Sequence, residues 1–431
     1  MPRRLLRLGR SLRYVHSHYL YVTTSEVLGL KIGIISDTHL GFGSGPREMD
    51  CFSQAEEAFS IGMSEADVIL FAGDLFDSGY PKPKSWYVAM GILSKRFSKD
   101  DSWDGEFISR DRELSANHLR GIPVVAIHGN HEIRRPINPI EALHKSSLLI
   151  NLHGESVVLE GSDGKLTIHG MGFVPDKYAA KALSSWSPSP EEGFNVLMLH
   201  QSVLGYVYPN ERPLEIGEIP KGFDLYVFGH IHTPNRGEIH GKPLLIPGST
   251  VRTQLSKSDL KERGIFLFDV EKGVDFFVKL RRQRTLIIKD FHFKDATVRE
   301  IEKEVREFLN EFPWENYELG PLIRIRILGE LKDGERKSDL DLKAISEEFK
   351  GKGIISFSNR LTSKFMRRLG RIRMARRGFL SVKELALSII EEEFGEMHSI
   401  SPREIFQVLE SDLPDEDVLE RLRRLLLDNR S

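Results

Sequence analysis

Seven polar side chains of the types that bind divalent metal ions occur in five separate segments: Asp37, His39, Asp74, Asn130, His200, His230 and His232. Carboxylate, amide oxygen and imidazole without thiolate suit ions such as Mn²⁺, Fe²⁺ or Zn²⁺. Seven ligands exceed what one tetrahedral site uses, so the set favours a two-metal centre. Such ions lie ~3.5–4 Å apart, clamp a phosphate and lower the pKa of a bridging water. Asp74 is the expected bridging ligand, because its carboxylate has two oxygens to share.

The segments that carry these residues follow predicted strands. Short apolar runs rich in Val and Ile, closed by Gly, Asn or Asp, are typical of strands buried on both faces. The runs lie at 31–36, 67–72, 122–128, 194–200 and 223–229. Helical stretches at 47–64 and 85–97 separate some of them, which predicts an alternating β/α chain.

Strand ends should bring the seven side chains together, because the carboxyl ends of strands in an open α/β sheet face one crevice. In extended backbone, residues i and i+2 point to the same side. We therefore expect Asp37 with His39, and His230 with His232, each to converge on one ion. An isolated Asp-x-His or His-x-His is usually an ordinary surface pair. Here five fragments occur in order, each after a predicted strand, so coincidence is rejected.

The remaining part of this region predicts smaller elements. Between Ser98 and Arg120 the chain is polar and charged, which we interpret as a surface insertion. Alternating apolar residues predict hairpin-like strands further on. These strands are expected at 155–160, 165–171, 243–247, 264–270 and 273–280.

The ordered fragments Asp-x-His, Gly-Asp, Gly-Asn-His-Glu, a lone His and Gly-His-x-His resemble the calcineurin-like metallophosphoesterases. The resemblance implies a sandwich of two β-sheets flanked by helices, with a dinuclear centre at one end. It implies one metal on Asp37, His39, Asp74 and His232, and the other on Asp74, Asn130, His200 and His230. His131 matches the family histidine that lies beside the phosphate and stabilises charge or protonates the leaving oxygen, work that suits a pKa of about 6.5.

The sequence segments around the motifs resemble those of DNA double-strand-break nucleases of the meiotic-recombination-eleven family, whose bacterial counterpart is SbcD. The matching stretches are 36–41, 72–77, 127–132, 228–234 and 246–253. The resemblance implies a manganese-dependent nuclease with 3′→5′ exonuclease action on duplex ends and endonuclease action on single strands. One residue departs from it: Asp77 stands where the family commonly has a histidine associated with handling DNA. Asp77 therefore either changes the nuclease mode or simply caps a turn.

The sequence divides into five regions. We expect a basic extension at 1–30 outside the fold, a nuclease domain at 31–283, an α+β capping domain at 284–358, a basic linker at 359–380 and a helical ATPase-binding segment at 381–431. The extension could also be a targeting segment or a nucleic-acid arm. The capping domain is predicted from strands at 285–293 and 322–330 and helices at 297–311 and 342–349. The linker has eight positive and no acidic residues over 359–377, and it could either follow a phosphate backbone or be a flexible spacer.

The last region predicts short amphipathic helices. Capping boxes begin at Ser381 and Ser401, and Val418, Leu422 and Leu425 share one helical face. The resemblance implies that this region binds the coiled coil of an SbcC-like ABC-type ATPase; a self-contained three-helix bundle is the alternative. Since the chain has no P-loop, ATP hydrolysis would come from another protein. The resemblance also implies a homodimer, for which 85–97, with Trp86, Met90, Leu93 and Phe97 on one face, is the candidate helix. The alternative is that this amphipathic helix simply covers the core, which is the commoner case.

Composition fits this interpretation. The 431 residues, 40% hydrophobic and 29% charged with a formal charge of −2, predict a folded protein of two to four domains. No apolar run reaches the roughly 18–20 residues of a membrane helix. The single cysteine, Cys51, excludes an intrachain disulfide framework and favours a reducing location, which we take to be cytoplasmic and nucleoid-associated.

We therefore expect a nuclease with two Mn²⁺ ions that acts on DNA in double-strand-break repair. Two alternatives stay open. The first is a small-substrate phosphodiesterase or phosphatase that uses the same metals. The second is a scaffold that bridges DNA and the ATPase, with cleavage secondary.

Overall fold

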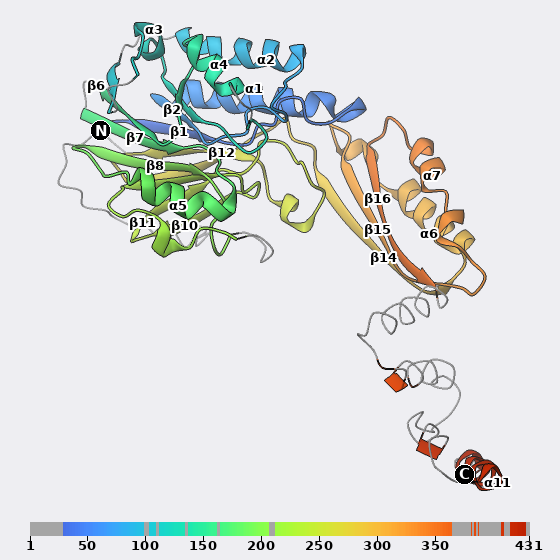
Figure 1. The fold of residues 1–431 in the computed structure, drawn as a ribbon. Coiled ribbons are helices and arrows are strands. Elements are labelled where there is room, and N and C mark those ends of the chain that lie inside the picture. The colour runs from blue at the N-terminus through green and yellow to red at the C-terminus, as the bar shows by residue number, and fades with distance from the viewer. Residues whose placement is uncertain are drawn as a thin grey trace, which may run out of the picture. The chain divides into compact units, whose positions relative to one another are not determined.

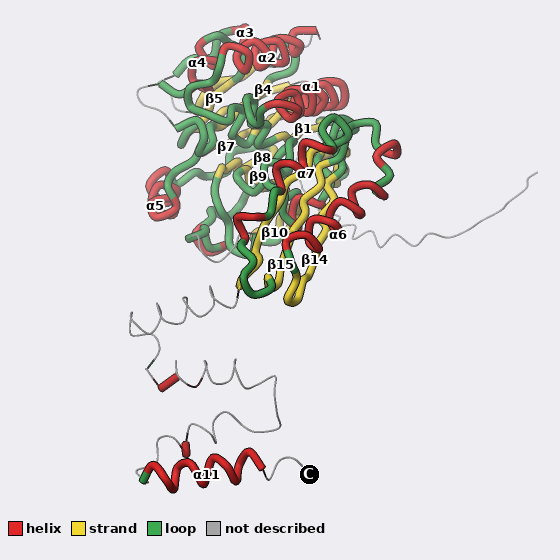
Figure 2. The backbone as a smooth tube through the Cα atoms, turned by 90° about the vertical axis from the view of Figure 1, so that its right-hand side faces the viewer, coloured by secondary structure: helices red, strands yellow, loops and turns green. Residues whose placement is uncertain are grey.

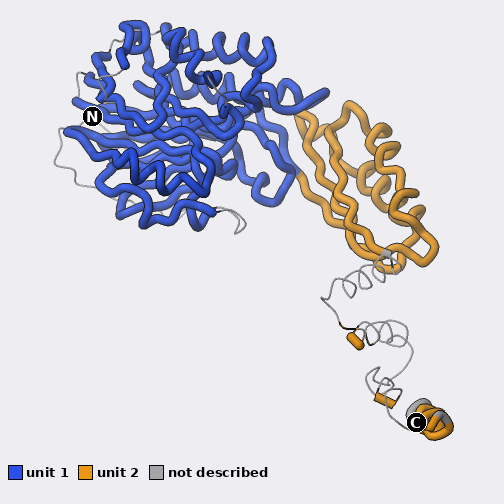
Figure 3. Tube along the Cα trace, in the orientation of Figure 1, with its two compact units in different colours: residues 1–286 blue, residues 287–431 orange. Residues whose placement is uncertain are grey.

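A computed structural model describes residues 29–98, 103–108, 112–133, 137–161, 164–206, 212–363 and 414–427, with a few single residues between 381 and 408. The chain forms two compact units that divide between Leu286 and Ile287 (Figure 3). The predicted basic extension, all but the first residues of the basic linker, and the capping box at Ser401 lie outside the described residues.

The first unit contains a six-stranded sheet in the order β13-β12-β1-β2-β4-β5. Its central strands pair in parallel and are almost wholly buried, which explains why they appear in the sequence as continuous apolar runs. The antiparallel β12 and β13 complete one edge. The strands are β1 (Lys31–Ile35), β2 (Val68–Phe71), β4 (Val124–Ile127), β5 (Ile150–Leu152), β12 (Gly264–Asp269) and β13 (Val274–Lys279).

A seven-stranded sheet lies against the first, in the order β10-β11-β9-β8-β7-β6-β3 (Figure 1). Ile34, Leu70 and Val125 of one sheet share a buried core with Ile168 and Val196 of the other, which confirms the predicted sandwich. Its strands are β3 (Asp104–Phe107), β6 (Glu155–Gly161), β7 (Gly164–Met171), β8 (Phe194–His200), β9 (Leu225–Gly229), β10 (Asn235–Ile239) and β11 (Lys242–Ile246).

Helices cover the outer faces of this sandwich (Figure 1). Phe52 and Phe59 of α1 pack with Ile69 and Phe71 on the outer face of the six-stranded sheet. On the other side, Leu183 of α5 packs in a cluster with residues of β8 and β9. The helices are α1 (Glu48–Glu65), α2 (Pro83–Ser94), α3 (Ala116–Leu119), α4 (Pro139–Lys145) and α5 (Asp176–Trp186).

One expectation for this unit is wrong, and the candidate dimer helix is only partly exposed. The segment predicted as a surface insertion contributes β3, which pairs with β6 at the edge of the seven-stranded sheet and buries Phe107. On α2, the four residues named for a dimer face are not all exposed: Leu93 is buried and Trp86 packs on Phe76, because this side of the helix covers the sheet. The exposed apolar side chains of α2 are Tyr87 and Met90.

The second unit is a three-stranded sheet, in the order β14-β15-β16, packed against two helices (Figure 2). The third strand, β16, was not predicted. It extends to Ser363, so residues 359–363 belong to this strand and not to the basic linker expected at 359–380. Among the described helices, none is long and apolar enough to cross a membrane. The elements are β14 (Leu286–Ala296), α6 (Val298–Glu311), β15 (Leu322–Leu331), α7 (Leu342–Glu348), β16 (Ile354–Ser363) and the C-terminal helix α11 (Asp415–Leu427).

Candidate metal centre

The seven predicted ligands lie on loops or strand ends at the carboxyl ends of β1, β2, β4, β8 and β9. Asp37 and His39 follow β1, Asp74 follows β2 and Asn130 follows β4. His200 is the last residue of β8, and His230 begins the loop after β9 that also holds His232. The structure brings all seven together in two adjoining groups.

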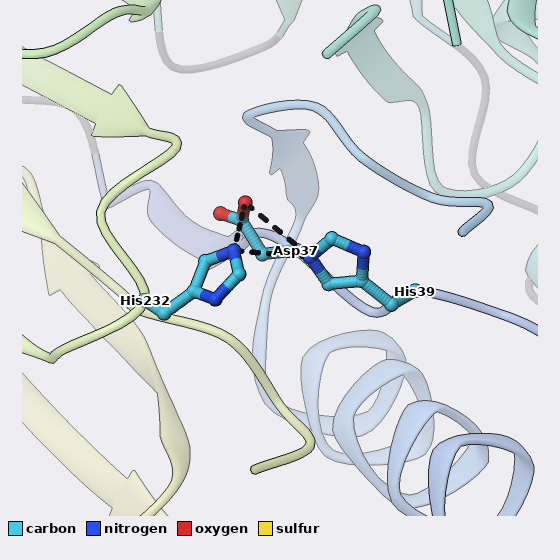
Figure 4. A group of neighbouring side chains, drawn as sticks. All are labelled: Asp37, His39 and His232. Atoms are coloured by element: carbon cyan, nitrogen blue, oxygen red, sulfur yellow. Dashed lines mark hydrogen bonds and ion pairs between the residues drawn. The ribbon is translucent and has the colours of Figure 1, made fainter. Parts of the chain in front are cut away.

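The first group consists of Asp37, His39 and His232 (Figure 4). The two Nε2 atoms of the histidines are 3.1 Å apart. Asp37 Oδ1 lies 3.5 Å from His232 Nε2 and 3.9 Å from His39 Nε2. Three ligand atoms from two distant parts of the chain therefore face one point.

The second group consists of Asp74, Asn130, His200 and His230. Asn130 Oδ1 lies 2.9 Å from His230 Nδ1 and 3.3 Å from His200 Nε2. His200 Nε2 is also 3.3 Å from Asp74 Oδ2. Ligand atoms of Asp37, Asp74 and His200 lie within 4.8 Å of one another, so the two groups adjoin.

The backbone at these residues is unusual. Asp37, His39, Asp74 and His230 all have positive φ, at 51°, 45°, 55° and 75°. Non-glycine residues seldom adopt this conformation, and such strain clusters at functional sites. The extended-strand expectation for the i and i+2 pairs is therefore wrong in its geometry. Asp37 and His39 still converge, whereas His230 turns to Asn130 and His232 turns to His39.

Two glycines leave room for the ligands. A Cβ on Gly129 would lie 2.0 Å from Asp74 Oδ1, and one on Gly73 would lie 2.3 Å from His200 Nδ1. Gly73 also has a φ of +97°, which side chains disfavour. The Gly-Asp and Gly-Asn-His motifs thus need glycine because the backbone passes against a ligand side chain.

Each carboxylate uses one oxygen within the protein and leaves the other without a hydrogen bond. Asp37 Oδ2 accepts from the Ser36 hydroxyl and from the His230 amide, and Asp74 Oδ1 accepts from the His131 amide. Asp37 Oδ1 and Asp74 Oδ2 are buried and make no hydrogen bond within the described chain. Buried oxygens of this kind are costly unless a cation or donor faces them, so this donor set fits divalent metal ions.

The electrostatics of the group agree with a cation site. Burial alone would raise the pKa of Asp37, but the His232 ring 3.5 Å away and the charges of neighbouring histidines hold it below its usual value. Burial likewise opposes ionisation of Asp74, and His200 outweighs it and lowers the Asp74 pKa. Burial lowers the pKa of His200, yet Asp74 raises it to about 9. A bound metal ion would replace that proton, because ligation requires neutral imidazole.

His131 lies at the edge of the group. Its ring is about one third exposed and stands edge-on to His39, with ring centroids 4.7 Å apart. Its Nδ1 lies 3.0 Å from the backbone oxygen of Asp77, which can only accept a hydrogen bond. His131 Nδ1 therefore carries a proton, and Nε2 is the ring atom left for a substrate.

Further residues, not predicted from the sequence, hold the candidate ligands in place. Glu132 is fully buried, and its carboxylate accepts from the amides of Gly129 and Phe76. Burial, reinforced by the Asp74 charge, raises the Glu132 pKa to about 8. Glu132 comes three residues after Gly129, and this spacing was a local signal for the hydrogen bond from the Gly129 amide to the Glu132 carboxylate that closes the turn around Asn130.

Other supports come from distant segments. His232 Nδ1 lies 2.7 Å from the Thr253 hydroxyl, and His200 Nδ1 donates to the Ala72 carbonyl at 2.6 Å. The buried guanidinium of Arg263 donates to the His232 carbonyl. Such outer contacts orient the rings that would bind metal. No local sequence pattern links these partners, so only the fold reveals them.

Comparison with known proteins is consistent with this geometry. Residues 30–234 match the calcineurin-like phosphoesterase family. The DNA double-strand break repair protein Mre11 of Methanopyrus kandleri is 30% identical over 292 residues, which are 60% of this chain and 59% of that protein. The double-strand break repair protein MRE11 of Encephalitozoon cuniculi is 27% identical over 308 residues, 65% of this chain and 53% of that protein.

A solved archaeal phosphodiesterase aligns over 58% of this chain and all of its own at 15% identity, but the TM-score of 0.29 adds nothing to the argument. The chain spans little more than half the length of the two Mre11 proteins. The match to the family covers every predicted ligand and His131. Residues 30–234 therefore match a calcineurin-like metallophosphoesterase domain, and the chain is similar to Mre11 proteins, as its motifs indicated.

Proposed function

We propose that this protein is a metal-dependent DNA nuclease of double-strand-break repair. The observation that carries the proposal is the convergence of seven candidate ligand side chains at the strand ends, where two buried carboxylate oxygens face imidazoles. The similarity to Mre11 repair proteins supports DNA as the substrate.

One metal ion would be held by Asp37, His39, Asp74 and His232. The other would be held by Asp74, Asn130, His200 and His230. Two Mn²⁺ ions are proposed, since oxygen and imidazole donors without thiolate suit that ion. Bound ions would supply Lewis-acid polarisation of the phosphodiester.

The protein's own residues orient the reaction. His131 is held by its Nδ1 proton on the Asp77 carbonyl and by its amide on Asp74 Oδ1, so its ring has a fixed direction. The ring is partly exposed, and Nε2 can donate to the leaving oxygen of a phosphodiester once the imidazole carries a second proton, as a general acid requires. The Glu132 carboxylate holds the turn that carries Asn130 and His131, because it accepts hydrogen bonds from the amides of Gly129 and Phe76.

Exonuclease action on duplex ends in the 3′→5′ direction and endonuclease action on single strands are part of the proposal, as are the partners. Val418 and Leu422 of α11 are only partly buried and Leu419 is 59% exposed. This exposure supports a helical segment that binds a coiled-coil ABC-type ATPase of the SbcC type. A homodimer is proposed through α2, where Tyr87 is 80% exposed.

The test is digestion of end-labelled duplex and single-stranded DNA by the full chain in Mn²⁺, with EDTA as the control. Wild type should degrade DNA, and His131→Ser should lose most of that activity while it still binds Mn²⁺. Turnover of small phosphate esters without DNA cleavage would identify a small-substrate phosphodiesterase. DNA binding without turnover of either substrate would indicate a scaffold.

A further inference from the structure

Asp77 lies in a loop that is fixed to the loop of the first ligands. The His39 amide donates to the Asp74 carbonyl at 3.1 Å, and the Leu40 amide donates to the Leu75 carbonyl at 2.8 Å. The Asp77 amide in turn donates to the Leu40 carbonyl at 3.2 Å. These three hydrogen bonds therefore fix the backbone of Asp77 beside the loop that carries Asp37 and His39.

Both oxygen-bearing groups of Asp77 face histidine rings. Its Oδ1 is 3.2 Å from His39 Nδ1 and 3.7 Å from His131 Nδ1, and its backbone oxygen is 3.0 Å from His131 Nδ1. The His39 ring is only 1% exposed, whereas Asp77 and His131 are each about one third exposed. One residue thus contacts a buried candidate ligand and the exposed histidine beside it.

We propose that Asp77 is the positioning residue for both rings, an inference that rests on the proposed metal-dependent function. The contact to His39 is an ion-pair contact, without the alignment of a full hydrogen bond. A carboxylate at that position favours a proton on His39 Nδ1. The lone pair then lies on Nε2, the atom that faces His232 Nε2 at 3.1 Å and Asp37 Oδ1 at 3.9 Å.

The support of His39 differs from that of other ligands. His200 rests on the neutral carbonyl of Ala72 and His232 on the neutral hydroxyl of Thr253. His39 instead faces a carboxylate, which increases the electron-donating power of the ring. The backbone oxygen of the same residue orients His131, so a side-chain change at Asp77 should weaken metal binding through His39 and leave the contact to His131 in place. A simple turn cap would not affect metal binding.

The experiment compares Asp77→Leu, Asp77→Asn and the control Asp104→Asn, an exposed carboxylate on β3. Calorimetric titration of the full chain with Mn²⁺ should show affinity at least about tenfold weaker in Asp77→Leu, and weakened less in Asp77→Asn, which keeps an acceptor oxygen. Asp104→Asn should match wild type. NMR spectra of ring-¹⁵N-histidine protein should show the Nδ1–H form of His39 in wild type and its loss in Asp77→Leu, with His39→Gln to assign the signal.

Wild-type Mn²⁺ affinity and an unchanged His39 signal in Asp77→Leu would overturn the inference. If Asp77→Leu fails to fold, the isosteric Asp77→Asn decides in the same way. These readouts do not depend on DNA. A wild type that binds Mn²⁺ but cleaves no DNA would therefore overturn the nuclease function alone, and a wild type that binds no Mn²⁺ would overturn both.

Discussion

The Nε2 atoms of His39 and His232 face each other at 3.1 Å, although 193 residues separate them in the chain. The opposite edge of each ring is occupied, by the Asp77 carboxylate for His39 and by the Thr253 hydroxyl for His232. Asp37 Oδ1 lies within 4 Å of both Nε2 atoms. A single proton can satisfy only one of these nitrogens as a donor, whereas a cation between them would use both lone pairs.

Asp37→Asn should therefore remove most of the stabilisation that Mn²⁺ gives to the protein. A ligand that binds only the folded state adds about 2.7 kcal/mol at 100 times its Kd. We expect thermal unfolding of wild type to move to higher temperature in Mn²⁺ and to return in EDTA. The variant should show less than half of that shift. Equal shifts in the two proteins would contradict a role for Asp37 as a ligand.

Gly129→Ala should disrupt the candidate metal centre by steric bulk alone, because the substitution changes no charge. The new methyl group would lie 2.0 Å from Asp74 Oδ1 and 2.6 Å from the Asp74 backbone nitrogen, so the carboxylate must move. We expect Mn²⁺ affinity, measured by calorimetry, to fall about tenfold or more.

The matched control is Gly91→Ala on α2, where a Cβ would meet open space. Alanine in a helix is favoured over glycine by roughly 0.5–1 kcal/mol, so this variant should be slightly more stable and bind Mn²⁺ normally. A Gly129→Ala protein with wild-type affinity would show that Asp74 does not need its observed position.

Much of the sandwich could be predicted because its central strands are buried on both faces and appear as apolar runs. β16 was missed although Ile355, Phe357 and Leu361 alternate with polar residues, because Arg360 begins a basic stretch that drew the interpretation towards a linker. β3 was missed because only Phe107 of its four residues is buried.

The candidate ligands that the structure brings together could be identified in the sequence, whereas their geometry could not. The positive φ of Asp37 depends on contacts such as the hydrogen bond that its amide donates to the Gly73 carbonyl, 36 residues away. The support of His232 by Thr253 and Arg263 likewise joins segments that carry no mutual pattern. Local sequence spacing therefore identifies the candidate ligands, whereas long-range hydrogen bonds determine how their side chains are oriented.

His144 should make the stability of the first unit pH-dependent. Burial, with the nearby Arg112 charge, lowers the pKa of His144 from 6.5 to about 4. Its ring stacks on His118 with centroids 4.5 Å apart. Above pH 6.5 both folded and unfolded states hold a neutral ring. Below it the unfolded state binds the proton first, so stability falls as pH drops towards 4.

At about 1.4 kcal/mol per pKa unit, the loss between pH 7 and pH 5 is of the order of 2 kcal/mol. Urea unfolding at several pH values, followed by tryptophan fluorescence, measures it. His144→Gln should unfold with a shallower pH dependence than wild type, and the exposed His292→Gln should not. Parallel curves for His144→Gln and wild type would contradict the assignment.

Arg96→Met should destabilise the first unit while sparing the metal centre. The Arg96 guanidinium is fully buried and donates to four backbone carbonyls, those of Asn117, His118, Ile122 and Ser147. Burial lowers its pKa to about 10, so it stays charged at neutral pH. Methionine fills similar space but leaves these carbonyls without their donor, at about 1–3 kcal/mol for each that stays unsatisfied.

We expect a loss of roughly 3 kcal/mol or more in the free energy of unfolding, measured with urea. Arg120→Met is the matched control, since Arg120 is exposed just after α3, and it should change stability by less than about 0.5 kcal/mol. Because Arg96 contacts no metal-centre residue in its hydrogen bonds, folded Arg96→Met should bind Mn²⁺ like wild type. A variant as stable as wild type would mean that water or a shifted backbone replaces the guanidinium donors.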